Sequence, residues 1–143
     1  MKLSKFMYRI IYLSSATTKF TNEEINKILE KSKSNNQSKG ITGLLLYSDG
    51  NILQIIEGKK QEIKDLFHKI SLDSRHRNII KVFEGKVSNR IYPNWRMAFN
   101  SYQKEATEIA FKNYDFLINE EDNIASTFIE TFLKSNKDKI VIK

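Results

Sequence analysis

The chain has 143 residues, of which 40% are hydrophobic and 11% aromatic. These values are expected for one compact globular domain that folds without disulfide or metal cross-links. It contains no cysteine, which excludes disulfide bonds, thiolate metal ligands, cysteine nucleophiles and any cysteinyl adduct with a cofactor. The formal net charge of +7 comes mostly from lysines scattered over residues 1–99, so we interpret it as a solvated surface and expect no nucleic-acid partner.

A strand and a helix are the first predicted elements. Residues 6–14 form a nearly continuous apolar run, the pattern of a strand that is covered on both faces. Thr21-Asn-Glu-Glu24 has the sequence of a capping box, and the apolar residues that follow it at helical spacing predict a helix to about Ser34. The polar residues Ser32 and Asn36 continue the same stripe of side chains.

A hairpin and a second helix follow. Residues 41–48 and 51–57 read as two strands around Asp49-Gly50, the strongest short turn signal in the chain. Apolar residues at helical spacing over residues 63–70 predict the second helix, which residues 73–77 terminate.

Two further strands, at residues 79–87 and 95–102, complete a βαββαββ order. This order predicts a ferredoxin-like α+β sandwich, in which both helices cover one face of an antiparallel sheet and the first and third strands are central neighbours. Residues 106–117 and 124–133 read as amphipathic helices, which we expect on the other face of the sheet.

The domain organisation expected from this order is a core over residues 1–102 with a helical extension of the same domain over residues 103–143. No apolar run reaches the roughly 18 residues that span a bilayer, so we expect no membrane partner. The start of the chain lacks an uninterrupted apolar segment and a small-residue cleavage site, so we expect a cytoplasmic protein.

Gln54 is a neutral amide whose immediate neighbours in the third predicted strand are all aliphatic. In a strand it shares a face with Ile52 and Ile56, so we expect it to be buried. A buried amide donor or acceptor costs about 1 to 3 kcal/mol if it has no partner. The partner is either a polar group of the core or a polar ligand that lies against the sheet.

Other polar groups converge on the same place. Tyr12 lies on the first strand, and Ser32, Asn35 and Asn36 lie near the end of the first helix. The first and third strands are expected to be neighbours beneath both helices, so these side chains and Gln54 are expected to meet. Apolar stripes on the two helices would supply flat walls for an aromatic ring, although each stripe taken singly also fits an ordinary core.

Familiar catalytic and metal-binding patterns are missing from the sequence. The two histidines, His68 and His76, are too few for a histidine-based metal site, and the pair Asp73 and His76 has no third ligand, so we expect no metal. The sequence has no Gly-x-Ser-x-Gly elbow, no Gly-x-Gly-x-x-Gly motif and no phosphate-binding loop.

Over about residues 8–100 the chain resembles the BLUF domain, a flavin-binding blue-light sensor. The order and spacing of five stretches carry this resemblance, and any one of them alone would be weak. They are Tyr8-Arg-Ile-Ile-Tyr-Leu-Ser14, Ser34-Asn-Asn-Gln-Ser-Lys-Gly-Ile-Thr-Gly-Leu-Leu-Leu-Tyr47, Ile52-Leu-Gln-Ile-Ile-Glu-Gly58, Asp73-Ser-Arg-His76 and Asn94-Trp-Arg-Met97.

The resemblance implies a flavin, normally FAD, that is bound noncovalently with its ring between the two helices. It places Asn36 and Arg75 at the polar edge of the ring and makes Ile28 and Ile70 its apolar walls. Other residues are assigned to the margin of the site or the phosphate tail. The full set implied for the flavin site is Ile28, Ser32, Asn35, Asn36, Gln54, Lys69, Ile70, Asp73, Arg75 and His76.

The resemblance also implies a photocycle without a covalent intermediate. Tyr12 is then the electron donor, and Gln54 relays the proton and ends as a rotated amide or a tautomer. Trp95 and Met97 would carry the signal away, although a core tryptophan and a gap-filling methionine fit the same positions. The chain is therefore expected to be a sensor and not an enzyme. Its tail, residues 103–143, would act on a protein partner and on a second copy of the chain.

Two other classes of function stay open from the residues alone. An acylphosphatase-like phosphohydrolase on the same fold would use Arg75 and Asn36 to hold a phosphate. A nucleic-acid-binding module would use a basic sheet face, but the central strands carry no aromatic pair in an RNA-recognition signature.

Overall fold

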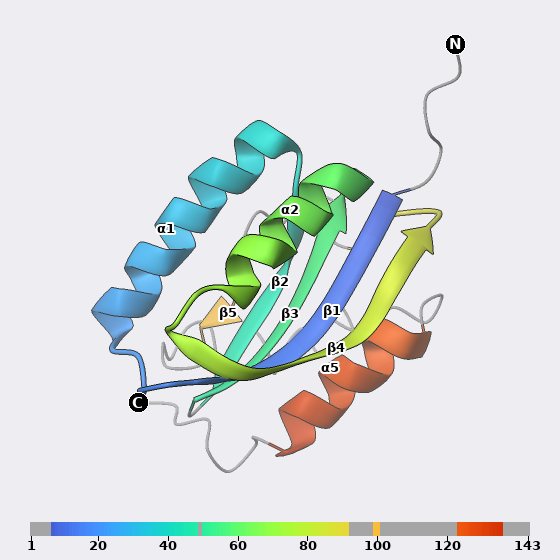
Figure 1. The fold of residues 1–143 in the computed structure, drawn as a ribbon. Helices are drawn as coiled ribbons and strands as arrows, with labels where there is room; N and C mark the ends of the chain where they lie inside the picture. The colour runs from blue at the N-terminus through green and yellow to red at the C-terminus, as the bar shows by residue number, and fades with distance from the viewer. Residues whose placement is uncertain (1–6, 49, 92–98, 101–122, 136–143) are drawn as a thin grey trace.

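The computed structural model describes residues 7–48, 50–91, 99–100 and 123–135. In chain order the elements are β1 (Met7–Ala16), α1 (Asn22–Lys39), β2 (Thr42–Ser48), β3 (Asn51–Gly58), α2 (Lys60–Ser71), β4 (His76–Val87), β5 (Phe99–Asn100) and α5 (Asn123–Ser135). The strands form one sheet, with α1 and α2 over one face and α5 over the opposite face (Figure 1). None of the helices in these ranges has the length and apolar character of a membrane-spanning segment.

The sheet has the strand order β4-β1-β3-β2-β5. β1 pairs antiparallel with both β3 and β4, and β2 pairs antiparallel with β3. This order confirms the predicted ferredoxin-like α+β arrangement with the first and third strands as central neighbours. β5 departs from the predicted antiparallel sheet because it pairs with β2 in parallel. The chain reverses its direction between β4 and β5, so β5 runs the same way as β2.

The two faces of the sheet have separate cores because side chains alternate along each strand. Ile10 of β1 and Ile56 of β3 pack against Ile63 of α2. On the other face, Ile11 of β1 packs in a cluster with Ile129 of α5. Each of these five side chains is at most 1% exposed. Burial on both faces explains why the central strands read as nearly continuous apolar runs.

The helix predicted over residues 124–133 is α5, and it covers the sheet face that we expected it to cover. Its buried side chains are Ala125, Ile129 and Phe132. The helix predicted over residues 106–117 lies outside the described residues.

Two element boundaries differ from the prediction. α1 begins with the predicted capping box, in which the backbone N–H of Glu24 donates to Thr21 Oγ1 at 3.1 Å. It ends at Lys39 and not near Ser34, because Gly40 adopts the left-handed conformation (φ 67°) and its N–H caps the last turn.

β4 begins at His76, three residues before its predicted start, because the polar residues there pair with the end of β1. The register between β1 and β4 shifts twice, and Asn78 has a positive φ of 55°. Of the strand predicted over residues 95–102, the described part is β5.

Candidate functional site

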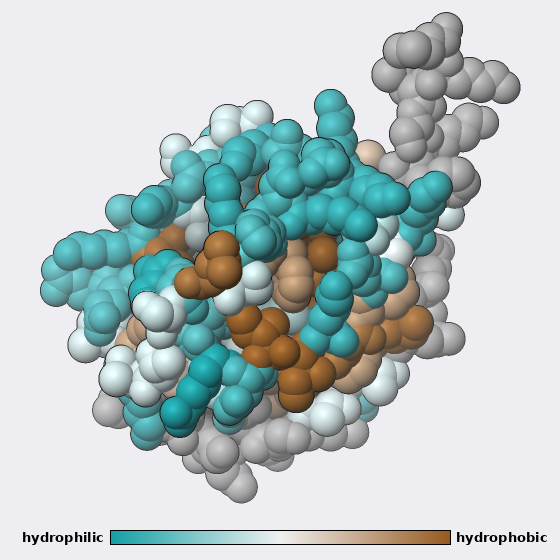
Figure 2. All heavy atoms as spheres, viewed as in Figure 1, coloured by the Kyte–Doolittle hydropathy of each residue, from teal (hydrophilic) through white to brown (hydrophobic). Residues whose placement is uncertain are grey.

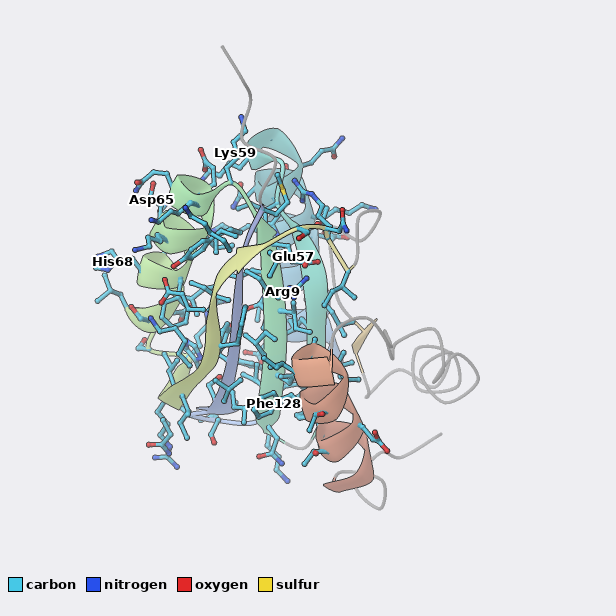
Figure 3. The ribbon with its side chains drawn as sticks, turned by 90° about the vertical axis from the view of Figure 1, so that its right-hand side faces the viewer. Arg9, Glu57, Lys59, Asp65, His68 and Phe128 are labelled. Carbon is cyan, nitrogen blue, oxygen red and sulfur yellow. The ribbon has the colours of Figure 1, made fainter. Side chains whose placement is uncertain are left out.

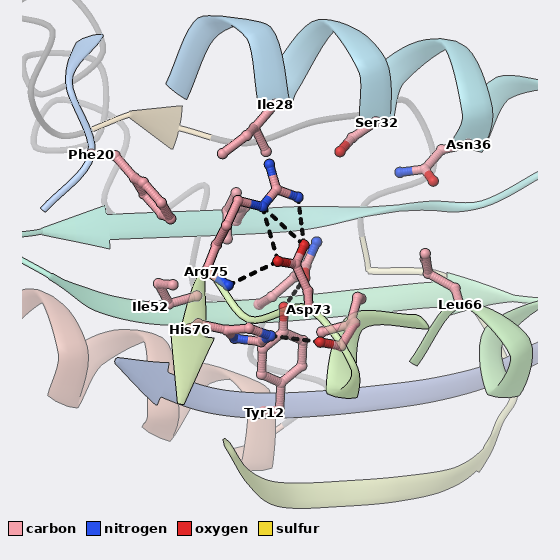
Figure 4. Close-up of a pocket in the computed structure, with 13 residues that line it drawn as sticks. Tyr12, Phe20, Ile28, Ser32, Asn36, Ile52, Leu66, Asp73, Arg75 and His76 are labelled. Atoms are coloured by element: carbon pink, nitrogen blue, oxygen red, sulfur yellow. Dashed lines mark hydrogen bonds and ion pairs between the residues drawn. The ribbon is translucent and has the colours of Figure 1, made fainter. Parts of the chain in front are cut away.

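A cavity of about 140 Å³ lies between α1, α2 and the sheet. Seen from the side of these helices, apolar atoms are exposed between them and polar residues surround those atoms (Figure 2). The lining residues come from every element on this side of the sheet (Figure 4). They are Tyr12, Phe20, Ile28, Ser32, Asn36, Leu45, Ile52, Gln54, Leu66, Ile70, Asp73, Arg75 and His76.

Tyr12 and Gln54 form the floor of the cavity. They are direct cross-strand partners on β1 and β3, and the Tyr12 hydroxyl donates a hydrogen bond to Gln54 Oε1. The core group that the sequence required for the amide is therefore a tyrosine. Gln54 is half-buried and not fully buried, because its side chain borders the cavity. Among the described residues, none accepts a hydrogen bond from its amide nitrogen.

The environment of Tyr12 keeps its phenol protonated. Its side chain is 3% exposed and packs against the Phe67 ring in an edge-to-face arrangement, with the ring centres 5.6 Å apart. Burial raises the pKa of Tyr12 well above its ordinary value, and the negative charge of Asp73 raises it further. The group that donates to Gln54 is therefore a neutral hydroxyl at physiological pH.

Asp73 and Arg75 form an ion pair at the border of the cavity. Arg75 Nη2 lies 2.5 Å from Asp73 Oδ2, and Arg75 Nε lies 2.9 Å from Asp73 Oδ1. In Figure 4 the guanidinium lies between Asp73 and Ile28 of α1. Hydrogen bonds from the guanidinium lower the pKa of the Asp73 carboxyl to about 2. The same contact raises the pKa of Arg75, so both groups are charged at neutral pH.

His76 closes the end of the cavity with both ring nitrogens engaged. Nε2 lies 2.6 Å from the backbone oxygen of Ile70, which only accepts, so Nε2 carries the proton. Nδ1 lies 2.8 Å from Ser14 Oγ, so in the neutral ring the serine hydroxyl donates to Nδ1. The ring centre of His76 lies 6.1 Å from that of Tyr12.

The wall on α1 consists of Ile28, Ser32 and Asn36, which recur every four residues and so share one face of the helix. Asn36 is the most enclosed of the three, with 8% of its surface exposed. Ile70 of α2 lines the opposite wall. The predicted apolar walls, Ile28 and Ile70, therefore both border the cavity.

Some of the residues assigned to the site from sequence do not line this cavity. Asn35 and Lys69 are exposed, and the side chains of their neighbours Asn36 and Ile70 line it in their place. Their assignment to the margin of the site stays a prediction. Trp95 and Met97 lie outside the described residues.

Four lining residues were not predicted, namely Phe20, Leu45, Ile52 and Leu66. Ile52 shares a strand face with Gln54, and Leu45 of β2 is the cross-strand partner of Gln54. Strand alternation and register would therefore have identified both Ile52 and Leu45. Phe20 precedes the N-cap of α1, and its backbone N–H donates to the Tyr47 hydroxyl at 3.0 Å. No pattern in the sequence connects that position with the cavity.

The arrangement suits a planar heteroaromatic ring. Apolar side chains from two helices face each other, and the groups between them donate and accept hydrogen bonds. The amide nitrogen of Gln54 supplies donors directed to this space that have no acceptor among the described residues. Within the same part of the chain, no group of three metal-ligating side chains is present.

Comparison with known proteins gives a consistent result. A sequence model of the BLUF family, described as sensors of blue light using FAD, matches residues 7–98. The alpha subunit of the photoactivated adenylate cyclase of Euglena gracilis is 35% identical over 91 residues, which are 62% of this chain and 9% of that protein. The dark-state structure of the BLUF protein BlrB is 27% identical, with a TM-score of 0.68 over 91% of this chain and 97% of that one.

A third similarity concerns the fold alone. The structure of Klebsiella pneumoniae BlrP1 with FMN and cyclic diGMP is 21% identical, with a TM-score of 0.71 over 90% of this chain and 36% of that one. This chain spans about a tenth of the length of the cyclase subunits that it matches. The similarity therefore concerns a small part of those proteins. The region of this chain that matches the family model contains every residue that lines the cavity described above.

Proposed function

Because this chain belongs to the BLUF family of blue-light sensors that use FAD, we propose that it binds FAD noncovalently between α1 and α2 and registers blue light there. The observation that carries this proposal is the Tyr12–Gln54 pair at the floor of a cavity with apolar walls. In this pair a protonated phenol donates to an amide oxygen, and the nitrogen of the same amide can donate to a ligand in the cavity.

The residues around the cavity have distinct roles in holding the ring. Ile28 and Ile70 contact its two faces, and Asn36 bonds its polar edge with Arg75 nearby. The cavity volume of about 140 Å³ is below the ~300 Å³ at which ligand pockets usually begin, so we expect side chains at the border of the cavity to move when the ring binds. The side chain of Arg75 is 57% exposed and can swing outward at little cost.

The remaining predicted contacts lie at the margin of the site. Asp73 and His76 border the cavity next to Arg75, and Ser32 borders it next to Asn36. Asn35 and Lys69 are exposed on the same two helices, where they would meet the phosphate tail and not the ring.

When bound, the flavin supplies absorption of blue light and an excited state that accepts an electron. Tyr12 would be the electron donor, and its hydroxyl proton would pass to Gln54 Oε1, the atom to which it already donates a hydrogen bond. Gln54 would hold that proton on its amide and return it to Tyr12 when the electron returns. Gln54 would then be left with its donor and acceptor ends rearranged, and Tyr12 would regain both the electron and the proton.

The output is a change in affinity for a partner. We assign the partner contact to residues 103–143, with Trp95 and Met97 as the relay and self-association through the same segment. Light changes that contact only to the extent that the two states of the sensor differ in free energy of binding. Proteins that copurify with the full chain in light and in darkness would identify the partner.

The first test is spectroscopic. The purified protein is expected to be yellow, and blue light is expected to shift its flavin spectrum slightly to the red, with recovery in darkness. Titration with FAD and with FMN separates the two flavins, and we expect FAD to bind more tightly. A protein that purifies without colour and takes up neither flavin would contradict the proposal.

The second test concerns the donor pair. Tyr12→Phe and Gln54→Leu are expected to keep bound flavin and to lose the reversible red shift, because each removes one end of the hydrogen bond. Tyr47→Phe is the matched control, since Tyr47 is a buried tyrosine in the same core cluster that does not line the cavity. Light-minus-dark difference spectra measure the outcome. A normal shift in Tyr12→Phe would remove Tyr12 from the role of donor.

A further inference from the structure

We propose that Arg90 is a positioning residue for the flavin site, which fixes the end of α1 that carries Asn36 to the segment leading from β4 toward β5. The inference rests on the proposed function, because Asn36 matters only if a ligand occupies the cavity. Arg90 does not line that cavity, and no motif in the sequence singled it out.

The guanidinium of Arg90 connects three parts of the fold. Its Nη2 donates to the backbone oxygen of Gly40 at 2.7 Å. Its Nη1 donates to Thr42 Oγ1 at 2.7 Å and to the backbone oxygen of Glu57 at 3.2 Å. A planar guanidinium can satisfy these acceptors together because its donors have a fixed fork geometry, and a lysine ammonium cannot reproduce that geometry.

The contact with Gly40 acts on Asn36 through the backbone. Gly40 is the C-cap of α1, and its N–H bonds back to the Asn36 carbonyl. The N–H of Ile41 donates to the same carbonyl at 2.9 Å. The peptide that Arg90 holds therefore belongs to the turn that fixes the last helical residue lining the cavity.

The backbone on both sides of Arg90 is held by a buried ion pair. Glu57 is fully buried and receives a hydrogen bond from Arg9 Nε at 2.8 Å. The backbone N–H of Ile91 donates to both carboxylate oxygens of Glu57, at 2.9 and 3.0 Å. Arg9 Nη2 also donates to the backbone oxygen of Asn89 at 3.1 Å.

Arg9 and Glu57 point toward each other near the end of the sheet that lies away from Phe128 of α5 (Figure 3). They are cross-strand partners, and Thr42 is the partner of Glu57 on the other side. One row across β1, β3 and β2 therefore holds residues 89–91 in place, and Arg90 connects that row to the end of α1. The chain continues from this segment to Trp95 and Met97.

The test is a double-mutant cycle on flavin affinity in the full chain, measured by titration with FAD. Arg90→Lys keeps the positive charge but loses the planar guanidinium with its forked donors. It is expected to weaken FAD binding between about twofold and thirtyfold. In an Asn36→Ala background the same change is expected to have no further effect, because the residue that it positions is gone. Arg77→Lys, on the exposed start of β4, is the matched control and should leave the affinity unchanged.

The outcomes of this cycle separate a positioning role from the alternatives. Equal weakening by Arg90→Lys in both backgrounds would show a merely structural role, and unchanged affinity would show none, so either overturns the proposal. If Asn36→Ala does not fold, Asn36→Ser replaces it in the cycle. A wild-type chain that binds no FAD removes the proposed function and this inference together. A wild-type chain that binds FAD with additive mutational effects removes the inference alone.

Discussion

The fold raises the pKa of Tyr12, and this change can be followed by experiment. Its raised pKa has two causes, burial and the Asp73 carboxylate. A tyrosine whose pKa is raised in the folded state adds stability that is fully present below its ordinary pKa of about 10. That stability is lost as the pH rises above 10 toward the folded value.

The light response should therefore persist in alkaline solution. At pH 10, where an ordinary tyrosine is half ionised, Tyr12 is expected to stay protonated, so the red shift should keep the amplitude that it has at pH 7. Light-minus-dark spectra at both pH values measure this, with circular dichroism as the control for folding. An amplitude that falls by half in a protein that is still folded would contradict the prediction.

At the level of single residues, the sequence located the polar groups better than it located the apolar lining. Tyr12, Asn36 and Gln54 were identified because a polar side chain inside an apolar pattern needs a partner, and all three border one cavity. Phe20 was missed because a single aromatic residue before a helix has many places to pack. Asn35 was grouped with Asn36 because sequence spacing does not settle the rotation of a helix at its end.

At the scale of the elements, the pairing of β2 with β3 leaves no room for a side chain at Gly43. A Cβ atom at this position would lie 1.9 Å from the backbone oxygen of Ile55, which cannot move without breaking the sheet. Gly85 of β4 offers a matched comparison, because its nearest atom would lie 3.5 Å away at the tip of the Phe83 ring.

Gly43→Ala is therefore expected to lower the free energy of unfolding by about 2 kcal/mol or more, because the clash forces the two strands apart. Gly85→Ala is expected to change it by less than about 1 kcal/mol, because the added methyl group makes an ordinary contact. Urea unfolding followed by circular dichroism measures both. Similar values for the two variants would mean that β2 and β3 are not in such close contact.

The type of each described element followed from its periodicity, but two boundaries did not. Helix α1 runs five residues beyond its last predicted position because Gly40 determines its end and the polar residues before Gly40 carry no apolar signal. The start of β4 was missed because His76 and Arg77 are polar and join the strand only by pairing with β1. Both errors have one cause, since local sequence does not report contacts made by the distant chain.

At the scale of the whole molecule, the buried pair of Arg9 and Glu57 connects two central strands to a segment much later in the chain. Arg9 is 3% exposed and Glu57 is fully buried, and the pair connects β1 and β3 to residues 89–91. Water does not reach these charges, so salt in the solution screens them weakly.

Glu57→Gln is expected to lower the free energy of unfolding by about 3 to 5 kcal/mol, because it removes the carboxylate charge that lies against the buried Arg9 guanidinium. Glu23→Gln is the control, since Glu23 meets Lys27 on the surface with side chains that are 81% and 75% exposed. That change is expected to cost less than about 1 kcal/mol. A Glu57→Gln variant as stable as the control would contradict the role given to the buried pair.

The layer order was predictable because the strands are apolar on both faces and the chain offers amphipathic helices for each. The buried ion pair was not, because Glu57 stands at the end of its predicted strand and no pattern pairs it with Arg9, the one charged residue in the apolar run over residues 6–14. Charged residues at strand ends usually face solvent. Their burial depends on Asn89 and Ile91, which reach this end of the sheet only in the folded chain.

Both members of the donor pair stand on interior strands. β1 has neighbours on each side, and so does β3, so neither backbone has a free edge at Tyr12 or Gln54. The amide protons of these strands should exchange with deuterium only when the whole domain opens. The donor and the relay therefore cannot shift as main chain. The change proposed for Gln54 lies in its side-chain amide, either as a rotation about the terminal bond, which is a broad and nearly two-fold torsion, or as a tautomer. In the proposed sensor, a change confined to this one amide would distinguish the illuminated state from the dark state until the protein recovers.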